Sequence, residues 1–453
     1  MKRTLLFALA FIAALALAGC ERKPLAERPT PPPESPAPAE SPATAAESPA
    51  TAAESPAPVG ETPRPVDETP APSPGQTPTP PAEQGPEAAV EEAPPSPQPS
   101  EESLAMRIGF FAPLSGPQAS FGMDALNGAT LATEEINLAG GILGHPLTLI
   151  IKDTESQPEK TSAVVTNLIN TEKVAALIGE ITTDRSLVAA TLAQSSGIPM
   201  ITPSATGEKV TSTGDYIFRA CYTDSVQAAV MDKFARSLDV KSVAILFDAS
   251  NPYGTGLMEA FKTDFAQHGG TIVAEEFYHA GDTDFAAQLN AIRDKNPESI
   301  FLPSYYGEAA LIIRQARQMA IDALFLGTDG WHATGLVEVG GLATNNCYFA
   351  SHFSSEQDSD KAKTFSGAYN AKFQIAPLAF AALAYDSVWL VADALKRAGS
   401  ADSTAVRDAI AATRDFPGVT GTISFDQGRD PKKPVIVIRV QDGKFAYLET
   451  SPP

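Results

Sequence analysis

The sequence predicts an α/β protein with two doubly wound parallel sheets in series, preceded by a long proline-rich segment. Between Met106 and Gly327, short apolar runs alternate with segments that carry apolar residues at helical spacing. This alternation is typical of parallel sheets that are covered by helices on both faces. The roughly 350 residues from Met106 onward are also too many for one hydrophobic core, so two domains are expected.

The expected strands and helices follow one another in a regular order. The first half is predicted to contain strands at 107–111, 147–153, 174–179 and 199–203, with helices at 121–137, 159–171 and 184–195. The second half is predicted to contain strands at 242–248, 271–277, 299–303 and 324–327, with helices at 254–268, 283–295 and 307–320. Ligands of such sheets bind beyond the carboxyl ends of the strands, so two facing domains would place one site in the cleft between them.

The first twenty residues have the pattern of a secretory signal. Lys2 and Arg3 precede an apolar stretch that ends at Ala18 and is too short to favour a membrane-spanning helix. The tetrapeptide Leu-Ala-Gly-Cys that ends at Cys20 resembles the lipobox of bacterial lipoproteins, in which the cysteine is acylated. The alternative is a small buried cysteine at the end of an ordinary helix. We expect residues 1–20 to be a lipoprotein signal peptide and Cys20 to carry the lipid anchor of an extracytoplasmic chain.

Residues 21–105 differ in composition from the rest of the chain. They hold 24 of the 39 prolines and no Phe, Trp or Tyr, and they contain 15 acidic but only 4 basic residues. Such a segment cannot bury enough apolar surface to offset its chain entropy, so we expect a disordered linker. It is either a tether that holds the folded body away from the membrane or a spacer without a length requirement.

Charge and cysteine usage restrict the function classes further. The net charge of −21 argues against a nucleic-acid partner, because such proteins present basic surfaces. After Cys20 the chain has two cysteines, Cys221 and Cys347. They could form a disulfide in an oxidising compartment, but we favour two separate buried thiols.

Catalytic and metal-binding signatures are not visible in the sequence. We find no Gly-x-Ser-x-Gly elbow, no His-Glu-x-x-His and no phosphate-binding loop, and the five histidines are scattered without ligand spacing. The sequence therefore predicts no catalytic residue, no metal ion and no cofactor. A constellation assembled only in three dimensions stays open at this point.

Several stretches resemble one family. They include Arg107-Ile-Gly-Phe-Phe-Ala-Pro-Leu-Ser-Gly-Pro, Ile178-Gly-Glu-Ile-Thr-Thr, Pro199-Met-Ile-Thr-Pro-Ser-Ala-Thr, Asn251-Pro-Tyr-Gly and Gly327-Thr-Asp-Gly. Their order and spacing resemble the branched-chain amino acid binding proteins, of the leucine/isoleucine/valine type, with a type I periplasmic binding fold. The resemblance extends from Met106 to Tyr447.

The resemblance implies an architecture and a role. The chain of such proteins crosses three times between two lobes, which here would comprise 106–222 plus 354–419 and 223–353 plus 420–453. It implies a monomeric, non-enzymatic receptor outside the cytoplasm. Such a receptor binds an amino acid, branched-chain or otherwise apolar, closes around it and delivers it to an ABC permease in the membrane.

The resemblance also implies ligand contacts in the first lobe. Thr183 matches a hydroxyl residue before a helix, where free N–H groups and the helix dipole suit a ligand carboxylate. The alternative is an ordinary helix cap. Ser204 would contribute its main chain and Thr206 its hydroxyl, although Thr206 could equally be a capping residue.

The second lobe is expected to hold the ligand ammonium group. Asp329 matches the family's acidic residue, although it is one methylene shorter than the usual glutamate, and its alternative is a turn aspartate. Tyr305, with Tyr306 as a near alternative, and Tyr253 match aromatic residues of the cleft. The ligand side chain would contact Phe121 and Trp331, of which Trp331 could instead pack inside the lobe.

Other functions remain to be weighed against this one. The same fold could serve a sensory or regulatory lipoprotein that does not take part in transport. It could also bind an amide, urea or an aromatic acid. An extracellular amidase is the competing enzyme hypothesis, but no nucleophile and base pair is visible.

Overall fold

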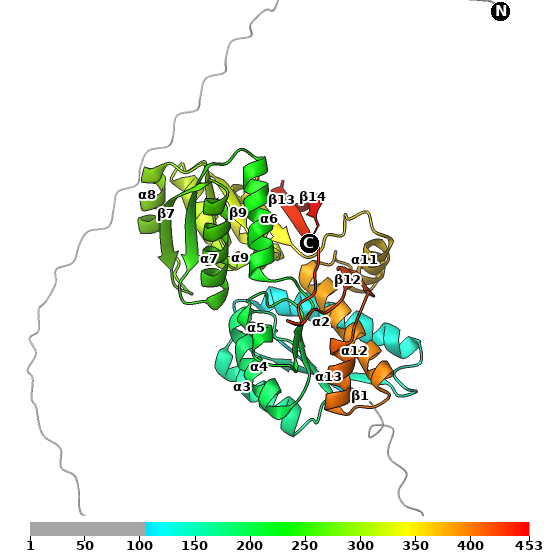
Figure 1. Cartoon of the computed structure of the whole chain (residues 1–453). Helices are drawn as coiled ribbons and strands as arrows, with labels where there is room; N and C mark the ends of the chain where they lie inside the picture. The colour runs from blue at the N-terminus through cyan, green and yellow to red at the C-terminus, as the bar shows by residue number, and fades with distance from the viewer. Residues whose placement is uncertain (1–105, 453) are drawn as a thin grey trace, which may run out of the picture. The chain divides into compact units, whose positions relative to one another are not determined.

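The computed structural model describes residues 106–452. The expected signal peptide, the lipidation residue Cys20 and the proline-rich linker lie outside the described residues. The described chain forms two lobes, and each is built around its own sheet (Figure 1). Among the helices of this part of the chain, none has the length and apolar character needed to cross a membrane.

The first lobe contains a parallel sheet with strand order β2-β1-β3-β4-β5. Its strands are β1 (Met106–Ala112), β2 (Leu147–Asp153), β3 (Ala176–Ile178), β4 (Met200–Thr202) and β5 (Ile217–Arg219). Its helices are α2 (Ala119–Leu138), α3 (Pro158–Asn170), α4 (Thr183–Ser196), α5 (Lys209–Ser212), α11 (Asp360–Phe373), α12 (Ala379–Ala398) and α13 (Ser403–Ala411). Side chains alternate along β1, so that Phe110 packs with α2 and α12 while Phe111 packs with α3 and α4. The sheet therefore has helices on both faces.

The second lobe contains a mixed sheet with strand order β14-β13-β10-β9-β8-β6-β7. Its strands are β6 (Ser242–Asp248), β7 (Thr271–Tyr278), β8 (Ser299–Phe301), β9 (Leu324–Gly327), β10 (Tyr348–Ser351), β13 (Val435–Gln441) and β14 (Lys444–Ser451). Its helices are α6 (Asp224–Ser237), α7 (Pro252–Gln267), α8 (Ala286–Lys295), α9 (Tyr306–Gln318) and α10 (Thr334–Gly340), with short 3-10 turns η1 (Asp329–Trp331) and η2 (Gly341–Thr344). The strands β6 to β10 are parallel, whereas β13 pairs antiparallel to β10 and β14 antiparallel to β13.

The chain passes between the two sheets three times. The first crossing lies between β5 and α6, the second between β10 and α11, and the third precedes β13. The prediction of two doubly wound lobes joined by three segments is therefore confirmed. The carboxyl ends of β3, β4, β8 and β9 lead directly into the segments that form the site described below.

A two-stranded hairpin, β11 (Phe416–Gly418) with β12 (Gly421–Ile423), precedes the third crossing. The lobe division expected from the sequence, with a boundary after residue 419, falls inside this hairpin and stays a prediction. Beyond that boundary Ile423 and Phe425 belong to the first-lobe core, and the ring of Phe425 lies 5.4 Å from that of Phe218. Arg219 Nε also donates to Asp430 Oδ1 at 2.6 Å. These contacts argue for a boundary near residue 430.

The two cysteines of the described chain are separate buried thiols, as the sequence analysis favoured. Cys221 lies in the first crossing, and Cys347 precedes β10. Burial raises the pKa of both thiols to about 12, so neither is a nucleophile at neutral pH.

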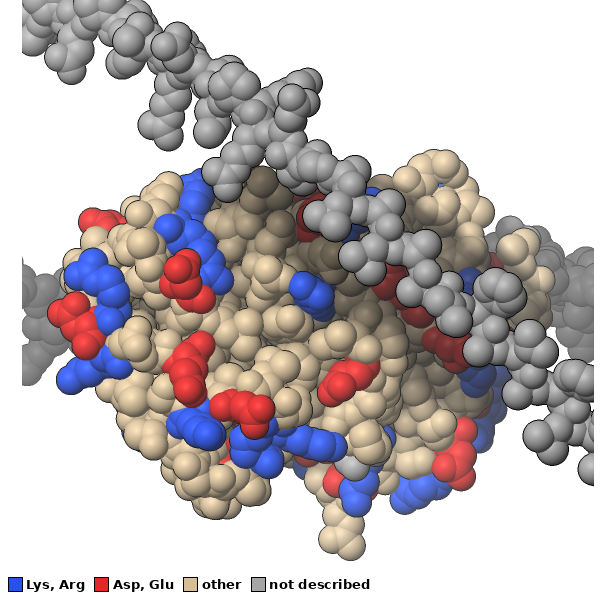
Figure 2. Space-filling model, turned by 90° about the horizontal axis from the view of Figure 1, so that it is seen from above, with Lys and Arg blue, Asp and Glu red and all other residues tan. Residues whose placement is uncertain are grey.

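Acidic and basic side chains are interspersed on the face of the molecule that Figure 2 draws. A nucleic-acid-binding face would instead gather Lys and Arg.

Candidate functional site

A narrow cavity with a volume of about 10 Å³ lies between the two lobes. Both lobes contribute to its wall, which consists of Phe121, Ile181, Thr182, Thr183, Ser204 and Phe380 from the first lobe and Tyr253, Tyr305, Asp329 and Gly330 from the second. The lobes also touch beside it, because Tyr306 Oη donates to the carbonyl of Pro117 at 2.7 Å. The free space holds about one water molecule, so a larger occupant would require the lobes to move apart.

The first-lobe wall is formed by hydroxyl groups and the start of a helix. β3 ends at Ile178, and α4 begins at Thr183, so the first turn of α4 faces the cavity. The Thr183 hydroxyl accepts a hydrogen bond from the N–H of Gly207 at 3.2 Å, which leaves its proton free to donate. The helix start and this hydroxyl form a site for an anionic group.

A buried ion pair supports that wall from behind. Glu180 Oε1 accepts from Arg185 Nε at 2.9 Å and from the Thr154 hydroxyl at 2.6 Å. Its Oε2 accepts the N–H groups of Ile181 and Thr182 at 2.7 and 3.0 Å. The Glu180 charge is therefore fully matched, and it orders the loop between β3 and α4 rather than adding negative charge to the cavity.

The second-lobe wall centres on a carboxylate. Asp329, only 3% exposed, lies in η1 directly after β9. Its Oδ1 accepts the Tyr253 hydroxyl at 2.7 Å, and its Oδ2 lies 3.0 Å from His352 Nε2. No Lys or Arg pairs with Asp329 among the described residues. A buried carboxylate with neutral partners favours a cationic ligand group.

Aromatic rings line the remaining wall. Tyr253 and Tyr305 are stacked, with their centroids 4.9 Å apart and an interplanar angle of 12°. Phe121 meets the edge of Tyr305 at 5.8 Å and packs against Phe380 at 4.4 Å. Such walls suit an apolar ligand side chain and, through the ring faces, an ammonium group.

A second buried carboxylate stands close to the site. Asp224, the first residue of α6, is 2% exposed, and its N–H donates to the carbonyl of Thr206 at 3.0 Å. Burial is the main cause that raises the pKa of Asp224, the nearby Thr206 hydroxyl opposes it and the negative charge of Asp329 adds to it, which brings the pKa to about 7. Asp224 also lines a separate pocket between α4 and α7, and that pocket shares Thr183 with the cavity.

The structure brings together six of the eight expected ligand residues, and they are Phe121, Thr183, Ser204, Tyr253, Tyr305 and Asp329. Thr206 and Trp331 do not line the cavity. Thr206 is buried beside Asp224. Trp331 packs in the second-lobe core, and its indole N–H donates to the carbonyl of Leu302 at 3.1 Å. Sequence reasoning did not include Glu180, Arg185, Asp224, Phe380 or His352, because none of them stands in a quoted motif as a ligand residue.

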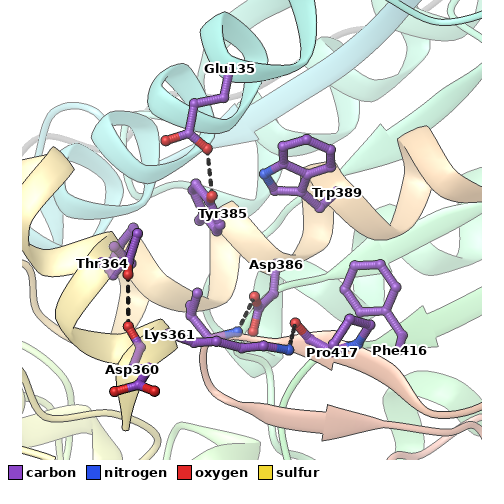
Figure 3. Close-up of a pocket in the computed structure, with 11 residues that line it drawn as sticks. Glu135, Asp360, Lys361, Thr364, Tyr385, Asp386, Trp389, Phe416 and Pro417 are labelled. Atoms are coloured by element: carbon purple, nitrogen blue, oxygen red, sulfur yellow. Dashed lines mark hydrogen bonds between the residues drawn. The ribbon is translucent and has the colours of Figure 1, made fainter. Parts of the chain in front are cut away.

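A larger, mostly apolar pocket lies on the first lobe, and we call it the outer groove. It has a volume of about 410 Å³ and is lined by Glu135, Asp360, Lys361, Thr364, Phe365, Tyr385, Asp386, Trp389, Phe416, Pro417 and Val419. Figure 3 shows Tyr385 of α12 reaching toward Glu135 of α2, to which its hydroxyl donates at 2.5 Å. The outer groove shares no lining residue with the cavity.

Within residues 106–452, no group of three or more His, Cys, Asp or Glu side chains is arranged to hold a metal ion. The features that remain are an anion-binding wall and a cation-binding wall that face each other across a small apolar space.

The family model for periplasmic binding proteins matches residues 105–444, well over half of the chain. The chain belongs to the periplasmic binding protein family. Its fold is thus the one that the resemblance implied, with two α/β lobes of the type I periplasmic binding arrangement.

Individual members of the family are similar over almost their whole length. A leucine-, isoleucine-, valine-, threonine- and alanine-binding protein of Pseudomonas aeruginosa is 32% identical over 329 residues, which are 72% of this chain and 87% of that protein. A leucine-binding protein of Thermotoga maritima has 34% identity and a TM-score of 0.74, and the match covers 77% of this chain and 99% of that one. A branched-chain amino acid transporter substrate-binding protein of Streptococcus pneumoniae, solved in complex with isoleucine, has 38% identity, a TM-score of 0.73 and coverages of 77% and 100%. These relatives are binding proteins rather than enzymes, and the periplasmic binding proteins of ABC transporters act outside the cytoplasm.

Proposed function

We propose that this periplasmic binding protein is the solute receptor of an ABC transporter and that it captures a branched-chain or other apolar amino acid between its lobes. The observation that carries the proposal is the pairing of opposite poles across one small cavity. Thr183 and the start of α4 stand on one side, and Asp329 stands on the other. An α-amino acid has a carboxylate and an ammonium group on one carbon, which matches both poles at once.

The mechanism is closure of the lobes around the ligand. A ligand that contacts both walls stabilises the closed arrangement by its differential affinity for that state. Enclosure then strengthens each polar contact, because water is excluded from the cavity. The permease would recognise the closed receptor, so no covalent chemistry is required of this chain.

The names of the relatives narrow the ligand class. The Pseudomonas aeruginosa relative is named for five small amino acids, and the Streptococcus pneumoniae structure holds isoleucine. The aromatic side wall of Phe121, Tyr253 and Tyr305 is compatible with an aliphatic side chain of this size. We therefore propose isoleucine, leucine and valine as the first ligands to test.

We further propose that the protein is a monomer held at the membrane by acyl chains on Cys20. The lipobox-like tetrapeptide supports the anchor, and residues 21–105 would connect it to the folded body. Mass spectrometry of the protein from its native membrane tests this proposal. A diacylated or triacylated N-terminal peptide that begins at Cys20 is expected, and a peptide that begins at Met1 would contradict it.

A thermal-shift screen of the purified chain against the twenty amino acids, short amides, urea and benzoate tests the ligand assignment. A ligand at 100 times its dissociation constant stabilises the folded state by about 2.7 kcal/mol, which gives a clear shift. A shift with isoleucine, leucine or valine is expected. A shift with only amides, urea or benzoate would overturn the amino-acid assignment.

Uptake of radiolabelled isoleucine by cells with and without the gene separates transport from sensing. Loss of high-affinity uptake in the deletion strain is expected. Unchanged uptake, together with binding of isoleucine in vitro, would assign the protein a sensory role.

A further inference from the structure

The three crossing segments bring buried side chains together at the hinge. Tyr222 belongs to the first crossing, His352 to the second and Lys433 to the third, and each is at most 1% exposed. Opening and closing of the lobes must change the backbone of these segments, because they alone connect the two sheets in residues 106–452. Side chains packed at this point are therefore placed to respond to lobe movement.

His352 connects the hinge to the ligand cavity. Its Nε2 lies 3.0 Å from Oδ2 of Asp329, which lines the cavity. The other ring nitrogen, Nδ1, has no hydrogen-bond partner within the described part of the chain. Since an ionised carboxylate only accepts hydrogen bonds, the geometry assigns the imidazole proton to Nε2. His352 therefore donates to the carboxylate that we propose as the ammonium site.

The same imidazole packs against the first crossing, which in turn contacts the third. The ring of Tyr222 stacks on it, with centroids 3.8 Å apart and planes inclined by 27°. Lys433 Nζ of the third crossing donates to the carbonyl of Ala220 in the first crossing at 2.8 Å. A movement of the first crossing relative to the second would therefore disturb the ring that holds Asp329.

The His352 imidazole is expected to be uncharged when it donates to Asp329. Burial lowers its pKa below the usual 6.5, the positive charge of Lys433 lowers it further, and Asp329 opposes this effect. His332, a second buried histidine nearby, hydrogen-bonds to Ser351 instead, and burial lowers its pKa to about 3. A neutral imidazole leaves the negative charge of Asp329 available to a ligand cation, whereas an imidazolium would compete for it.

We propose that His352 is a positioning residue for ammonium recognition. Its Nε2–H fixes the Asp329 carboxylate in the cavity, and its stacking on Tyr222 links that carboxylate to the hinge. Affinity for a ligand cation is thereby coupled to lobe closure. This inference rests on the proposed function as an amino-acid receptor, and it goes further by assigning a hinge residue to ligand selectivity.

The first experiment compares three variants of the full chain by calorimetry. His352→Leu removes the donor, and His352→Gln keeps a side-chain N–H. His332→Leu removes a buried imidazole that hydrogen-bonds to Ser351 and not to the Asp329 carboxylate. The probes are isoleucine and 3-methylpentanoic acid, which lacks only the α-ammonium group. We expect His352→Leu to reduce the preference for isoleucine over the acid about tenfold, because Asp329 loses the charge-assisted hydrogen bond that fixes its carboxylate in the cavity. We expect His352→Gln and His332→Leu to retain the preference to within threefold.

A purely structural role for His352 would weaken both probes in parallel and leave their ratio unchanged. That result would overturn the positioning role while leaving the amino-acid receptor intact. The same conclusion would follow if His352→Gln lost the preference as completely as His352→Leu.

The second experiment needs no ligand. Nitrogen NMR of ¹⁵N-histidine protein, with His352 assigned by its loss in His352→Gln, reports the tautomer directly. We expect the Nε2–H tautomer and a shift of its signal in Asp329→Asn. An Nδ1–H tautomer, or a signal that does not respond to Asp329→Asn, would overturn the contact. If the wild-type chain binds no amino acid, the proposed function fails, and this spectrum alone decides whether His352 holds Asp329.

Discussion

The two walls of the cavity differ in how their buried carboxylates are compensated. The first-lobe wall contains a full buried ion pair, yet Glu180 is matched by Arg185, by a hydroxyl and by two backbone N–H groups. The second-lobe wall has Asp329 with only a tyrosine hydroxyl and a histidine as side-chain donors. The buried charges behind the first wall therefore compensate each other, and this wall would bind a ligand through its hydroxyl and helix-terminal donors. The second wall retains the negative charge of Asp329.

This difference indicates where ligand selectivity resides. An anionic group can bind hydroxyls and a helix start in many contexts, because backbone N–H groups are always present there. A cation needs a buried, under-compensated carboxylate, which is costly without its ligand. We therefore expect the second wall to determine whether a ligand must carry an ammonium group, and the first wall to contribute less.

The largest effect is expected from Asp329→Asn. The amide keeps the size and one acceptor oxygen but removes the charge, so isoleucine binding should weaken by about 2–5 kcal/mol. Calorimetry measures this change, and Asp322→Asn is the control because Asp322 is an exposed aspartate of the same lobe. An affinity within threefold of wild type would mean that the second wall does not bind a cation.

A smaller, pH-dependent effect is expected at Asp224. Its folded pKa of about 7 lies above the usual 3.8, so the folded state holds a proton that the unfolded state has already released. Protonation of Asp224 therefore contributes to the free energy of unfolding below about pH 4, and this contribution is lost as the pH rises through 7. The loss is at most roughly 4 kcal/mol. Without ligand, the unfolding free energy of wild type should therefore fall relative to that of Asp224→Asn between about pH 4 and 7. Parallel urea-unfolding curves over this range would contradict the buried carboxylate.

Thr183→Val tests the contribution of the first-lobe wall to ligand binding. Loss of one hydroxyl donor should cost about 1 kcal/mol of isoleucine binding, which is roughly fivefold in affinity. Thr191→Val is the matched control, since Thr191 lies on the same helix with an exposed side chain. A loss as large as that of Asp329→Asn would reverse the ranking of the two walls.

The smallest effect on isoleucine binding is expected from Tyr385→Phe in the outer groove. The change removes the hydrogen bond to Glu135 and should cost about 1 kcal/mol of unfolding free energy. Isoleucine affinity should stay within twofold of wild type, because the outer groove shares no residue with the cavity. A selective loss of isoleucine binding would show that the outer groove belongs to the ligand site.

Regular strands were the most predictable part of the fold. The predicted strands 147–153, 242–248 and 324–327 have the same bounds as β2, β6 and β9, because each is a short apolar run that ends at polar or glycine residues. The helix expected from residue 184 begins at Thr183. The elements after residue 327 were not assigned individually, and β13 (Val435–Gln441) pairs antiparallel with β10 some ninety residues earlier in the sequence. Local periodicity does not encode a pairing over that distance.

The site residues also differ in how far local sequence could place them. Asp329 and Trp331 are two residues apart in one short turn, yet Asp329 faces the cavity and Trp331 packs into the core. A tryptophan side chain suits either a cavity wall or a core, so only the orientation of η1 decides where Trp331 packs. In the sequence, Asp224 has the position of an ordinary acidic residue at the start of a helix. In the structure it is buried beside Thr206, and its pKa is raised.

The sequence by itself determined the α/β class, the need for two lobes and the family resemblance, together with most residues of both walls. These features follow from hydrophobic periodicity, chain length and short motifs, all of which are local or additive properties. Only the tertiary structure decided that Glu180 is neutralised, that Asp329 is not, and that His352 joins Asp329 to the hinge. Those properties depend on burial and on contacts between segments far apart in the chain. A charge acquires its energy from its surroundings, and a sequence does not specify those surroundings until the chain is folded.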